Sequence, residues 1–399
     1  MSTNVCFLNS NNGSGLLAFG GMDILVVDQV NSLDKIDVFI EERPNKFIFM
    51  CLSYDLKNQI EILKSENRDS TSFPDLVLWC PDFVFDIYGE SCNMLQGDGS
   101  KKEYDFAKDF INSAKSVVNK KIKISFEPQI SKDLYIRKVN SLKEHIQAGD
   151  IYEINFCQEF IAKNINKKDI EGCYTKLNNI TKAPFSSYFK FGDFEIFCGS
   201  PERFIKKKGN ILKAQPIKGT AKRGRNKSED LLLKSALKND PKERAENIMI
   251  VDLMRNDLSK IAKKGSVNVN ELCEVYTYKT VHQMVSTISC ELRGGQSFTD
   301  IVQATFPMGS MTGAPKIRAM QLIEEYEDFK RGLYSGSIGY LSPNGDFDLN
   351  VVIRTLIYNS ITRTLSCAVG SAITIQADAE REYAECGIKV QKILDGISG

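Results

Sequence analysis

Histidine is scarce in this chain: among its 399 residues only His145 and His282 carry an imidazole. Two are too few for a metal site built from several histidines, the H-E-x-x-H type included. The 11 cysteines are scattered from Cys6 to Cys386 without a C-x-x-C pair, which excludes a zinc knuckle and a dithiol redox motif. A catalytic metal would therefore need oxygen ligands, and that means Mg²⁺ or a similar hard cation.

Net charge and long apolar runs are also lacking. The formal net charge is +1, which gives no electrostatic basis for binding nucleic acid or a membrane surface. The apolar runs are far shorter than the roughly 20 residues that span a bilayer. Residues 1–20 contain no basic segment followed by an apolar core, so we expect no secretory signal. Scattered cysteines without a framework suit a reducing compartment, and we expect a cytoplasmic protein.

What the sequence does contain is an ordinary globular composition, with 42% hydrophobic and 26% charged residues. Strands and helices are predicted without strict alternation, which favours an α+β fold over a doubly wound sheet. Apolar or alternating runs predict strands at 45–56, 76–88, 151–161, 186–198, 211–220, 281–292, 334–341, 348–357 and 364–372. Apolar spacing and capping residues predict helices at 101–120, 131–147, 168–180, 241–253, 317–329 and 379–397.

The chemical signals are unevenly distributed along the chain. Residues 1–125 carry no chemistry that can be named, and the mixed stretch 120–133 could join them to the region 130–399, where candidate sites gather. In that region the Gly-rich segment FPMGSMTGAPK resembles a phosphate-binding loop. Its second glycine comes one place too early for G-x-x-x-x-G-K-[ST], and a proline precedes its lysine. We therefore reject nucleotide phosphate binding there.

The hexapeptide QPIKGT places Lys218 between a proline and a glycine. Proline stiffens the chain just before the lysine, and glycine lets the backbone turn or lets a ligand come close. A lysine that is partly desolvated or near other cations loses its proton more easily and becomes a usable nucleophile. Glu202, 16 residues earlier on a neighbouring predicted strand, is a candidate acid–base group. The alternative interpretation of Lys218 is a surface lysine in a loop.

Two predicted helices each carry a pair of glutamates three residues apart: Glu243 with Glu246, and Glu382 with Glu385. Residues at this spacing share a helix face, so each pair concentrates like charge. Carboxylates together with water and an anionic substrate are the usual ligands of Mg²⁺. The alternative is two solvated helix faces. Arg354 and Lys389 are candidates to bind substrate carboxylates, although Arg354 could instead be a structural cation and His282 a core histidine.

Eight segments in series resemble those of chorismate-utilising enzymes. In chain order they are GSPERF, PIKGT, IVDLMRNDL, HQMVSTI, FPMGSMTGAPKIRAMQLIEE, RGLYSGSIGYL, VVIRTL and EREYAE, within residues 135–395. The chain is most similar to the aminodeoxychorismate synthase component I branch, because PIKGT has a lysine where anthranilate synthases typically have alanine. The resemblance implies one large α/β/β/α sandwich with the site between its two sheets, to which residues 1–125 also belong.

The resemblance also implies a Mg²⁺-dependent amination of chorismate to 4-amino-4-deoxychorismate. Lys218 matches the lysine that adds to C2 of chorismate, and Glu202 matches the general acid for departure of the C4 hydroxyl. Glu246 and Glu385 match direct Mg²⁺ ligands, and Glu243 and Glu382 match their water-mediated partners. The positions that match the chorismate pocket are His282, Ser310, Tyr334, Arg354, Gly370 and Lys389.

Departures from the family pattern reduce the number of reactions that the resemblance allows. Glu153 occupies a position that is lysine in the isochorismate-forming and salicylate-forming branches, where that lysine activates water. Ser310 replaces the usual threonine and keeps the hydroxyl, and Ser371 and Ala372 follow Gly370 where the family tends to be Gly-rich. The Leu-Leu-Glu-Ser signature of the tryptophan feedback site is missing, so feedback by tryptophan is not expected.

The source of ammonia and two competing functions complete the hypothesis. The chain has no G-x-C-x-G elbow, so we expect it to use free ammonia or ammonia from a separate glutaminase subunit. The main alternative is the large subunit of an anthranilate synthase, and a remote one is a chorismate-binding regulatory subunit without activity. A related alternative is that the chain also eliminates pyruvate and releases 4-aminobenzoate without a separate lyase.

Overall fold

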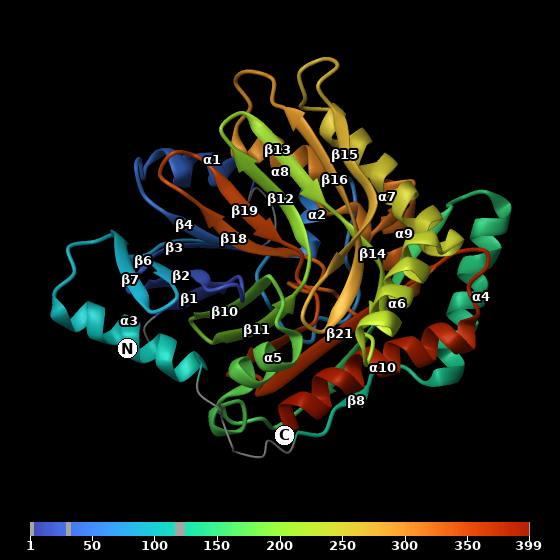
Figure 1. Ribbon diagram of the computed structural model, residues 1–399, viewed down its shortest axis with the longest axis horizontal. Helices are drawn as coiled ribbons and strands as arrows, with labels where there is room; N and C mark the ends of the chain where they lie inside the picture. Colours follow the sequence, from blue (N-terminus) through green and yellow to red (C-terminus); the bar gives the residue numbers. More distant parts are fainter. Residues whose placement is uncertain (1–3, 29–32, 116–123, 399) are drawn as a thin grey trace.

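The computed structural model describes residues 4–28, 33–115 and 124–398, whose strands form two antiparallel sheets (Figure 1). The larger sheet has 11 of the described strands and the smaller has 10. In spatial order the larger sheet contains β17 (Gly313–Ala314), β9 (Glu153–Ala162), β21 (Thr364–Ile373), β20 (Thr355–Asn359), β11 (Phe194–Ser200), β10 (Phe185–Phe191), β1 (Val5–Asn9), β2 (Ser14–Phe19), β6 (Phe83–Tyr88) and β7 (Ser91–Gln96), with β8 (Glu127–Pro128) beside β9.

The smaller sheet follows a second path through the chain. Its order is β14 (Ile217–Lys222), β16 (Val281–Glu291), β13 (Ile211–Gln215), β12 (Arg203–Lys208), β19 (Phe347–Asn350), β18 (Ser337–Leu341), β4 (Ile48–Leu52), β5 (Leu76–Cys80) and β3 (Asp23–Val27), with β15 (Asn268–Thr277) also paired to β16. Strands from residues 1–125 lie inside both sheets, because β1 pairs with β10 and β4 pairs with β18.

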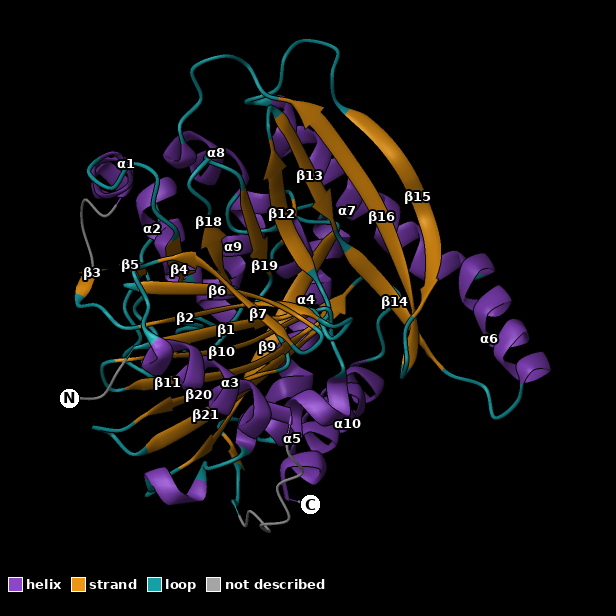
Figure 2. Ribbon diagram, turned by 60° about the vertical axis from the view of Figure 1, so that its left-hand side comes forward, coloured by secondary structure: helices purple, strands orange, loops and turns teal. Residues whose placement is uncertain are grey.

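Helices cover the outer faces of the two sheets, so the architecture is an α/β/β/α sandwich (Figure 2). The helices are α1 (Leu33–Glu41), α2 (Lys57–Ile60), α3 (Lys101–Lys115), α4 (Lys132–Ala148), α5 (Cys173–Thr181), α6 (Lys227–Asn239), α7 (Pro241–Ser259), α8 (Phe298–Thr305), α9 (Lys316–Tyr326) and α10 (Ala379–Ser398). Helices α3, α4, α5 and α10 pack on the larger sheet, and α7 packs on the smaller. The sequence-based α+β prediction is confirmed.

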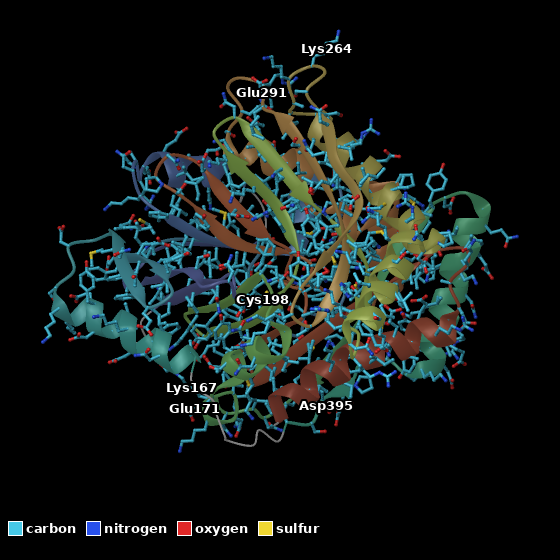
Figure 3. The ribbon with its side chains drawn as sticks, in the orientation of Figure 1. Lys167, Glu171, Cys198, Lys264, Glu291 and Asp395 are labelled. Carbon is cyan, nitrogen blue, oxygen red and sulfur yellow. The ribbon has the colours of Figure 1, made fainter. Side chains whose placement is uncertain are left out.

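The main apolar core lies between the sheets and includes residues of both. Cys198 on β11 belongs to it, together with Trp79 and Met50 of the opposite sheet (Figure 3). A second cluster fills the space between the larger sheet and its helices. Each of the 11 cysteines is a free thiol. In the described part of the chain, no helix combines the length and apolar character that crossing a bilayer requires.

Local sequence signals explain the ends of several helices. Asp240 caps α7 by accepting from the N–H groups of Lys242 and Glu243, and Pro241 takes the first helical position, where no donor is needed. Ser131 caps α4 in the same way, and Gly149 ends it with φ +86°. The predicted helix at 101–120 is α3, which is described to Lys115.

Several predicted strands are divided in the structure. The run 76–88 forms β5 and β6, which belong to different sheets, because Pro81 and Asp82 turn the chain between them. The run 348–357 likewise forms β19 and β20 in different sheets. The run 186–198 is the β10–β11 hairpin, whose turn contains Gly192 at φ +49°. Apolar character predicted these strands correctly, but it did not show that two of the runs are divided between the sheets.

Candidate active site

One cavity of about 500 Å³ collects most of the predicted site residues. Its volume lies in the range of roughly 300–1,000 Å³ that is common for small-molecule sites. Both sheets contribute to its wall, through β14 and β21, and so do helices α7 and α10. The predicted residues that line it are Glu202, Lys218, Glu243, Glu246, Ser310, Tyr334, Arg354, Gly370, Glu382, Glu385 and Lys389.

Lys218 lies in β14, and Pro216 separates this strand from the preceding strand β13. Its Nζ is 2.5 Å from Oε1 of Glu153, which reaches it from β9 of the opposite sheet. Gly219 has φ +84°, and a Cβ there would lie 3.0 Å from Oε2 of Glu243. Glycine at this position therefore permits both the turn and the close approach of α7.

The charge on Lys218 differs from the sequence-based expectation. Burial opposes its ammonium form, but the nearby Glu153 and Glu246 carboxylates outweigh this effect and raise the pKa of Lys218 above its ordinary value. The expectation that Lys218 would lose its proton easily is therefore wrong for the substrate-free site. A nucleophilic lysine here needs a base that takes its proton.

Glu202 lies between β11 and β12 and is 4% exposed. Burial raises the pKa of Glu202 to about 7, since the apolar surroundings disfavour its ionised form. Near neutral pH it therefore holds a proton for part of the time, as a general acid must. The structure thus gives Glu202 a protonation state that suits the role predicted for it.

Three cationic side chains, those of Arg354, Lys389 and Lys392, line the same cavity. Arg354 has φ +52°, a backbone strain that non-glycine residues rarely adopt, and burial lowers its pKa. Its guanidinium makes no hydrogen bond or ion pair within the described residues. Nζ of Lys389 lies 3.0 Å from the carbonyl oxygen of Gly370 and 2.7 Å from Oε1 of Glu385. Lys392, one turn further along α10, lines the same cavity. These three cations suit an anionic substrate.

The four glutamates of α7 and α10 face the cavity but have different surroundings. Glu246 is 7% exposed, and burial raises its pKa to about 7. Burial also raises the pKa of Glu243. Glu382 is 5% exposed and accepts a hydrogen bond from Ser371, whereas Glu385 is exposed and paired with Lys389. Both helices therefore present carboxylates to one space.

Lys242 stands among these carboxylates, a contact that sequence reasoning missed. Its Nζ is 3.8 Å from Oε1 of Glu246 and 3.9 Å from Oε1 of Glu382. The charges of all four glutamates, with Glu246 first, outweigh the effect of burial and raise the pKa of Lys242. Its position four residues before Glu246 on the same helix is the signal that could have revealed it.

The side chains around Lys242 fit a hard divalent cation. Oε1 of the buried Glu246 has no hydrogen-bond partner among the described residues, and an ammonium already lies between the two acidic helices. Across the described ranges, no three Asp, Glu, His or Cys side chains are grouped closely enough to enclose a metal ion. The donor set therefore has the right chemistry, and a cation would have to draw α7 and α10 carboxylates together.

The remaining predicted residues have clear positions. Ser310 is 8% exposed and Tyr334 4% exposed at the cavity wall. A Cβ on Gly370 would lie 2.6 Å from the sulfur of Cys157, so only glycine fits there. His282 does not line the cavity, although its neighbours in β16 do. Its Nε2 is 2.9 Å from Oδ1 of Asp230 and its Nδ1 is 3.0 Å from the hydroxyl of Thr277.

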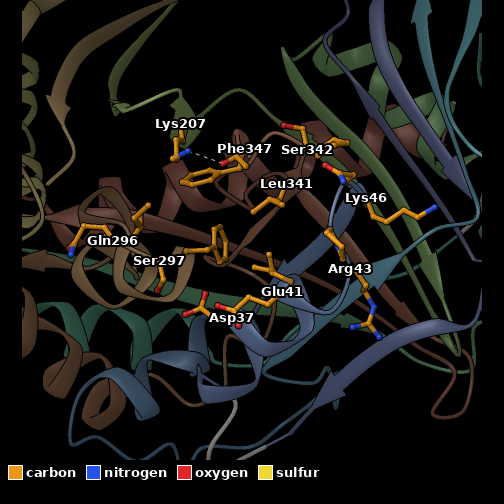
Figure 4. A pocket seen from close by; sticks show the side chains of 17 residues that line it. Asp37, Glu41, Arg43, Lys46, Lys207, Gln296, Ser297, Leu341, Ser342 and Phe347 are labelled. Carbon is orange, nitrogen blue, oxygen red and sulfur yellow. Dashed lines mark hydrogen bonds between the residues drawn. The ribbon is translucent and has the colours of Figure 1, made fainter. Parts of the chain in front are cut away.

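A second cavity of about 310 Å³ lies between α1, α8 and the loop after β18 (Figure 4). Its lining combines apolar side chains such as Leu341 and Phe347 with charged ones such as Asp37 and Lys46. Lys207 at its edge donates to the carbonyl oxygen of Gly345 at 3.0 Å. None of the predicted site residues lines this second cavity.

Comparison with known proteins points to one family. Residues 20–395 match the family described as chorismate binding enzyme. The chain is 34% identical over 348 residues to aminodeoxychorismate synthase component 1 of Bacillus subtilis, covering 84% of this chain and 73% of that protein. It is 44% identical over 279 residues to the probable chloroplastic aminodeoxychorismate synthase of rice, which covers 69% of this chain and 30% of the rice protein. The chain thus spans less than a third of that plant relative.

A solved structure gives the same answer for the fold. The crystal structure of anthranilate synthase component I from Streptococcus pneumoniae superimposes with a TM-score of 0.77 at 26% identity, covering 98% of this chain and 91% of the other. Two activities therefore occur among the names of similar proteins, and the site must be used to choose between them.

Proposed function

This chain belongs to the family of chorismate-binding enzymes, and we propose that it aminates chorismate to 4-amino-4-deoxychorismate with ammonia as the nitrogen donor. The observation that carries the proposal is Lys218 in the wall of the cavity, paired with Glu153. A lysine at this position of the PIKGT segment distinguishes the aminodeoxychorismate synthase branch from anthranilate synthases with alanine. The names of the bacterial and plant relatives support the same choice.

Chorismate is a dianion, and the cavity has cations to receive its two carboxylates. The guanidinium of Arg354 makes no hydrogen bond or ion pair within the described residues, and Lys389 extends from α10 into the same space. A guanidinium can bind a carboxylate through two parallel N–H donors. The carbonyl oxygen of Gly370 accepts a hydrogen bond from Nζ of Lys389 and so helps to place this ammonium at the cavity wall. These residues would orient the ring with its reacting edge toward Glu202 and Lys218.

The proposed reaction consists of two displacements. The Lys218 amine forms a bond to C2, the ring double bond moves, and the C4–O bond breaks while Glu202 donates the proton that makes water the leaving group. Ammonia then bonds to C4, the double bond returns, and the C2–N bond breaks to release Lys218. Two displacements on one ring deliver nitrogen to C4, whereas direct attack of ammonia at C2 would lead toward anthranilate.

We propose Mg²⁺ as the cofactor, bound by Glu246 and Glu385 with Glu243 and Glu382 contributing through water. When bound, it would supply positive charge to a substrate carboxylate. The buried, unpartnered oxygen of Glu246 supports this assignment. Lys242 lies between Glu246 and Glu382 and would have to yield its place to the metal, which its exposure allows.

We further propose that a separate glutaminase subunit supplies the ammonia. The designation "component 1" of the bacterial relatives is consistent with a second component. A glutaminase needs a nucleophilic cysteine beside a histidine. His145 contacts Asp150 and Tyr326, and His282 contacts Asp230 and Thr277, so neither imidazole is arranged with a cysteine.

Incubating the purified chain with chorismate, Mg²⁺ and ammonium tests the proposed function. We expect 4-amino-4-deoxychorismate, identified by mass and by its conversion to 4-aminobenzoate when a lyase is added. Replacing ammonium with glutamine should leave the isolated chain nearly inactive. Direct release of anthranilate would favour the alternative that the Streptococcus pneumoniae structure represents, and glutamine-dependent turnover would contradict the separate glutaminase.

Removal of the metal should inactivate the enzyme. We expect EDTA to abolish turnover and Mg²⁺ to restore it, and we expect Glu385→Gln to weaken Mg²⁺ binding about tenfold or more in calorimetry. Glu380→Gln is the matched control, since Glu380 lies on the same helix but pairs with Lys132 outside the cavity. Full activity in EDTA, or equal Mg²⁺ affinity in both variants, would refute the metal assignment.

A further inference from the structure

The ion pair between Glu153 and Lys218 connects the two sheets beside the cavity. Glu153 begins β9 of the larger sheet, and Lys218 lies in β14 of the smaller. Their side chains are 1% and 11% exposed, and the Oε1–Nζ distance is 2.5 Å. A charge pair so deeply buried is costly to desolvate and is weak evidence for a role in stability alone. Its location beside the reacting cavity suggests a chemical role.

The second oxygen of Glu153 separates this residue from an ordinary buried carboxylate. Oε2 is buried and has no hydrogen-bond partner among the described residues. Glu159 offers a direct comparison, because it lies six residues further along the same strand, on the same face, and is 2% exposed. Its carboxylate accepts hydrogen bonds from Ser70 and Ser366. Glu153 therefore retains acceptor capacity that a purely structural carboxylate would use.

The proposed reaction needs such an acceptor. The free amine, not the ammonium, is the nucleophile, so one proton must leave Nζ before the bond to C2 forms. Glu202 cannot take this proton, because it must donate one to the leaving hydroxyl. Glu246 and Glu243 would be engaged by the metal. The only remaining carboxylate at hydrogen-bond distance from Nζ in the described chain is that of Glu153.

We propose that Glu153 is the positioning residue for the Lys218 nucleophile and the acceptor of its proton. One N–H proton of Lys218 moves to Oε1, which converts the carboxylate to a carboxylic acid, and the nitrogen lone pair is then free to bond to C2. When the second displacement releases the lysine as an amine, the same proton returns to Nζ. No further reactant is required. This role rests on the proposed function, because it assumes that Lys218 is the nucleophile.

Pairing with Glu153 allows Lys218 to be both buried and charged before it reacts. The ion pair fixes the Nζ atom at one place in the cavity wall, which lowers the entropy that must be lost when the substrate arrives. Transfer of the proton then neutralises both partners before the bond to C2 forms, so neither is left at that point as an uncompensated buried charge. A substrate that displaces water from the cavity favours this neutral state.

Glu153→Gln tests the proposal, with Glu159→Gln as the matched control on the same strand. We expect Glu153→Gln to lower kcat with ammonia about 10²-fold or more, with KM for chorismate changed less than about threefold, because a general base contributes at this level. Glu153→Asp, which keeps the carboxylate, should recover part of kcat. Glu159→Gln should retain wild-type kcat. Melting temperatures and circular dichroism of all variants establish that they are folded.

A second measurement does not depend on turnover. Acetylation of Lys218 by acetic anhydride, followed by peptide mass spectrometry at one pH, reports how readily its amine becomes free. We expect Lys218 to react several-fold faster in Glu153→Gln than in the wild type and Glu159→Gln, because no carboxylate then holds the ammonium. Equal kcat and equal labelling in the two Gln variants would overturn the proposal. Absence of aminodeoxychorismate formation by the wild type would instead refute the proposed function and leave the labelling result interpretable.

Discussion

Lys218→Ala is expected to abolish aminodeoxychorismate formation, with a loss in kcat of about 10³-fold or more, as for other covalent nucleophiles. The reason is chemical: without an amine at this position the first displacement at C2 has no attacking group from the protein. Since alanine matches anthranilate synthases at this position, slow formation of anthranilate is the expected residual activity. Product analysis after long incubation with chorismate, ammonium and Mg²⁺ measures both outcomes.

The stability of this variant needs its own control, because Glu153 would lose its buried partner. Removing one member of a buried ion pair costs roughly 3–5 kcal/mol. Lys218→Gln leaves an N–H donor for Glu153 and should be the more stable of the two while equally inactive. Lys213→Ala removes an exposed lysine of the neighbouring β13 and should behave as wild type. Unchanged amination in either Lys218 variant would reject the nucleophile.

Trapping the adduct gives independent evidence for the same residue. When ammonia is withheld, the first displacement should stop at the covalent intermediate. Intact-protein mass spectrometry should then show a mass gain of one chorismate minus water, which peptide mapping assigns to Lys218. Neither Lys218 variant can form this adduct. A mass gain on another lysine of the cavity, such as Lys242 or Lys389, would move the nucleophile elsewhere.

Much of this fold follows from local signals in the sequence. The cap at Asp240 with Pro241 and the stop at Gly149 fixed helix ends that the structure confirms. Local signals did not reveal where the chain leaves one sheet for the other, as between β5 and β6 or between β19 and β20. Val351 and Val352, between β19 and β20, are buried, so the apolar pattern continues through that crossing. Only tertiary pairing assigns each half to its sheet.

The sequence predicted which residues form the candidate site better than it predicted their charge states. Eleven predicted residues line one cavity, because their motifs lie at strand ends and helix faces that the fold brings together. The contact of Lys218 with Glu153 depends on tertiary packing, because the two residues belong to different sheets. The contact of Lys242 with Glu246 lies within one helix and depends on which rotamers the side chains adopt. Burial lowers the pKa of Lys218, but the Glu153 and Glu246 carboxylates outweigh this effect and raise it. A sequence can show that a lysine is confined, but not which carboxylates surround it.

His282 illustrates the limit of transferring a role by motif. The HQMVSTI segment forms β16 as predicted, and Val281 and Gln283 line the cavity. The imidazole between them points to Asp230 of α6 instead. Alternation along a strand requires this, since neighbouring side chains face opposite sides unless the strand twists or bulges. Its predicted contact with chorismate remains a prediction.

Glu202→Gln is expected to lower kcat/KM for chorismate by about 10²–10⁴-fold, the usual contribution of a general acid. The pH profile carries the more specific expectation. Burial raises the pKa of Glu202 to about 7, so the carboxyl holds its proton below that pH and loses it above. Because the acid form is the active form, wild-type kcat/KM should fall about tenfold per pH unit above neutrality. A solvated glutamic acid with a pKa near 4.3 would already be ionised throughout this range.

The comparison between wild type and Glu202→Gln isolates this descending limb. The pKa of Glu246 is also raised to about 7, so the profile must be measured at saturating Mg²⁺, which holds that carboxylate ionised. Glutamine cannot ionise, and the variant should lose the descending limb while any ascending limb from the Lys218–Glu153 pair persists. Glu274→Gln, on the exposed side of β15, should keep the wild-type profile. Because glutamine has no ionisable proton, a descending limb that persists in Glu202→Gln would have to come from another group. That group would then be the proton donor.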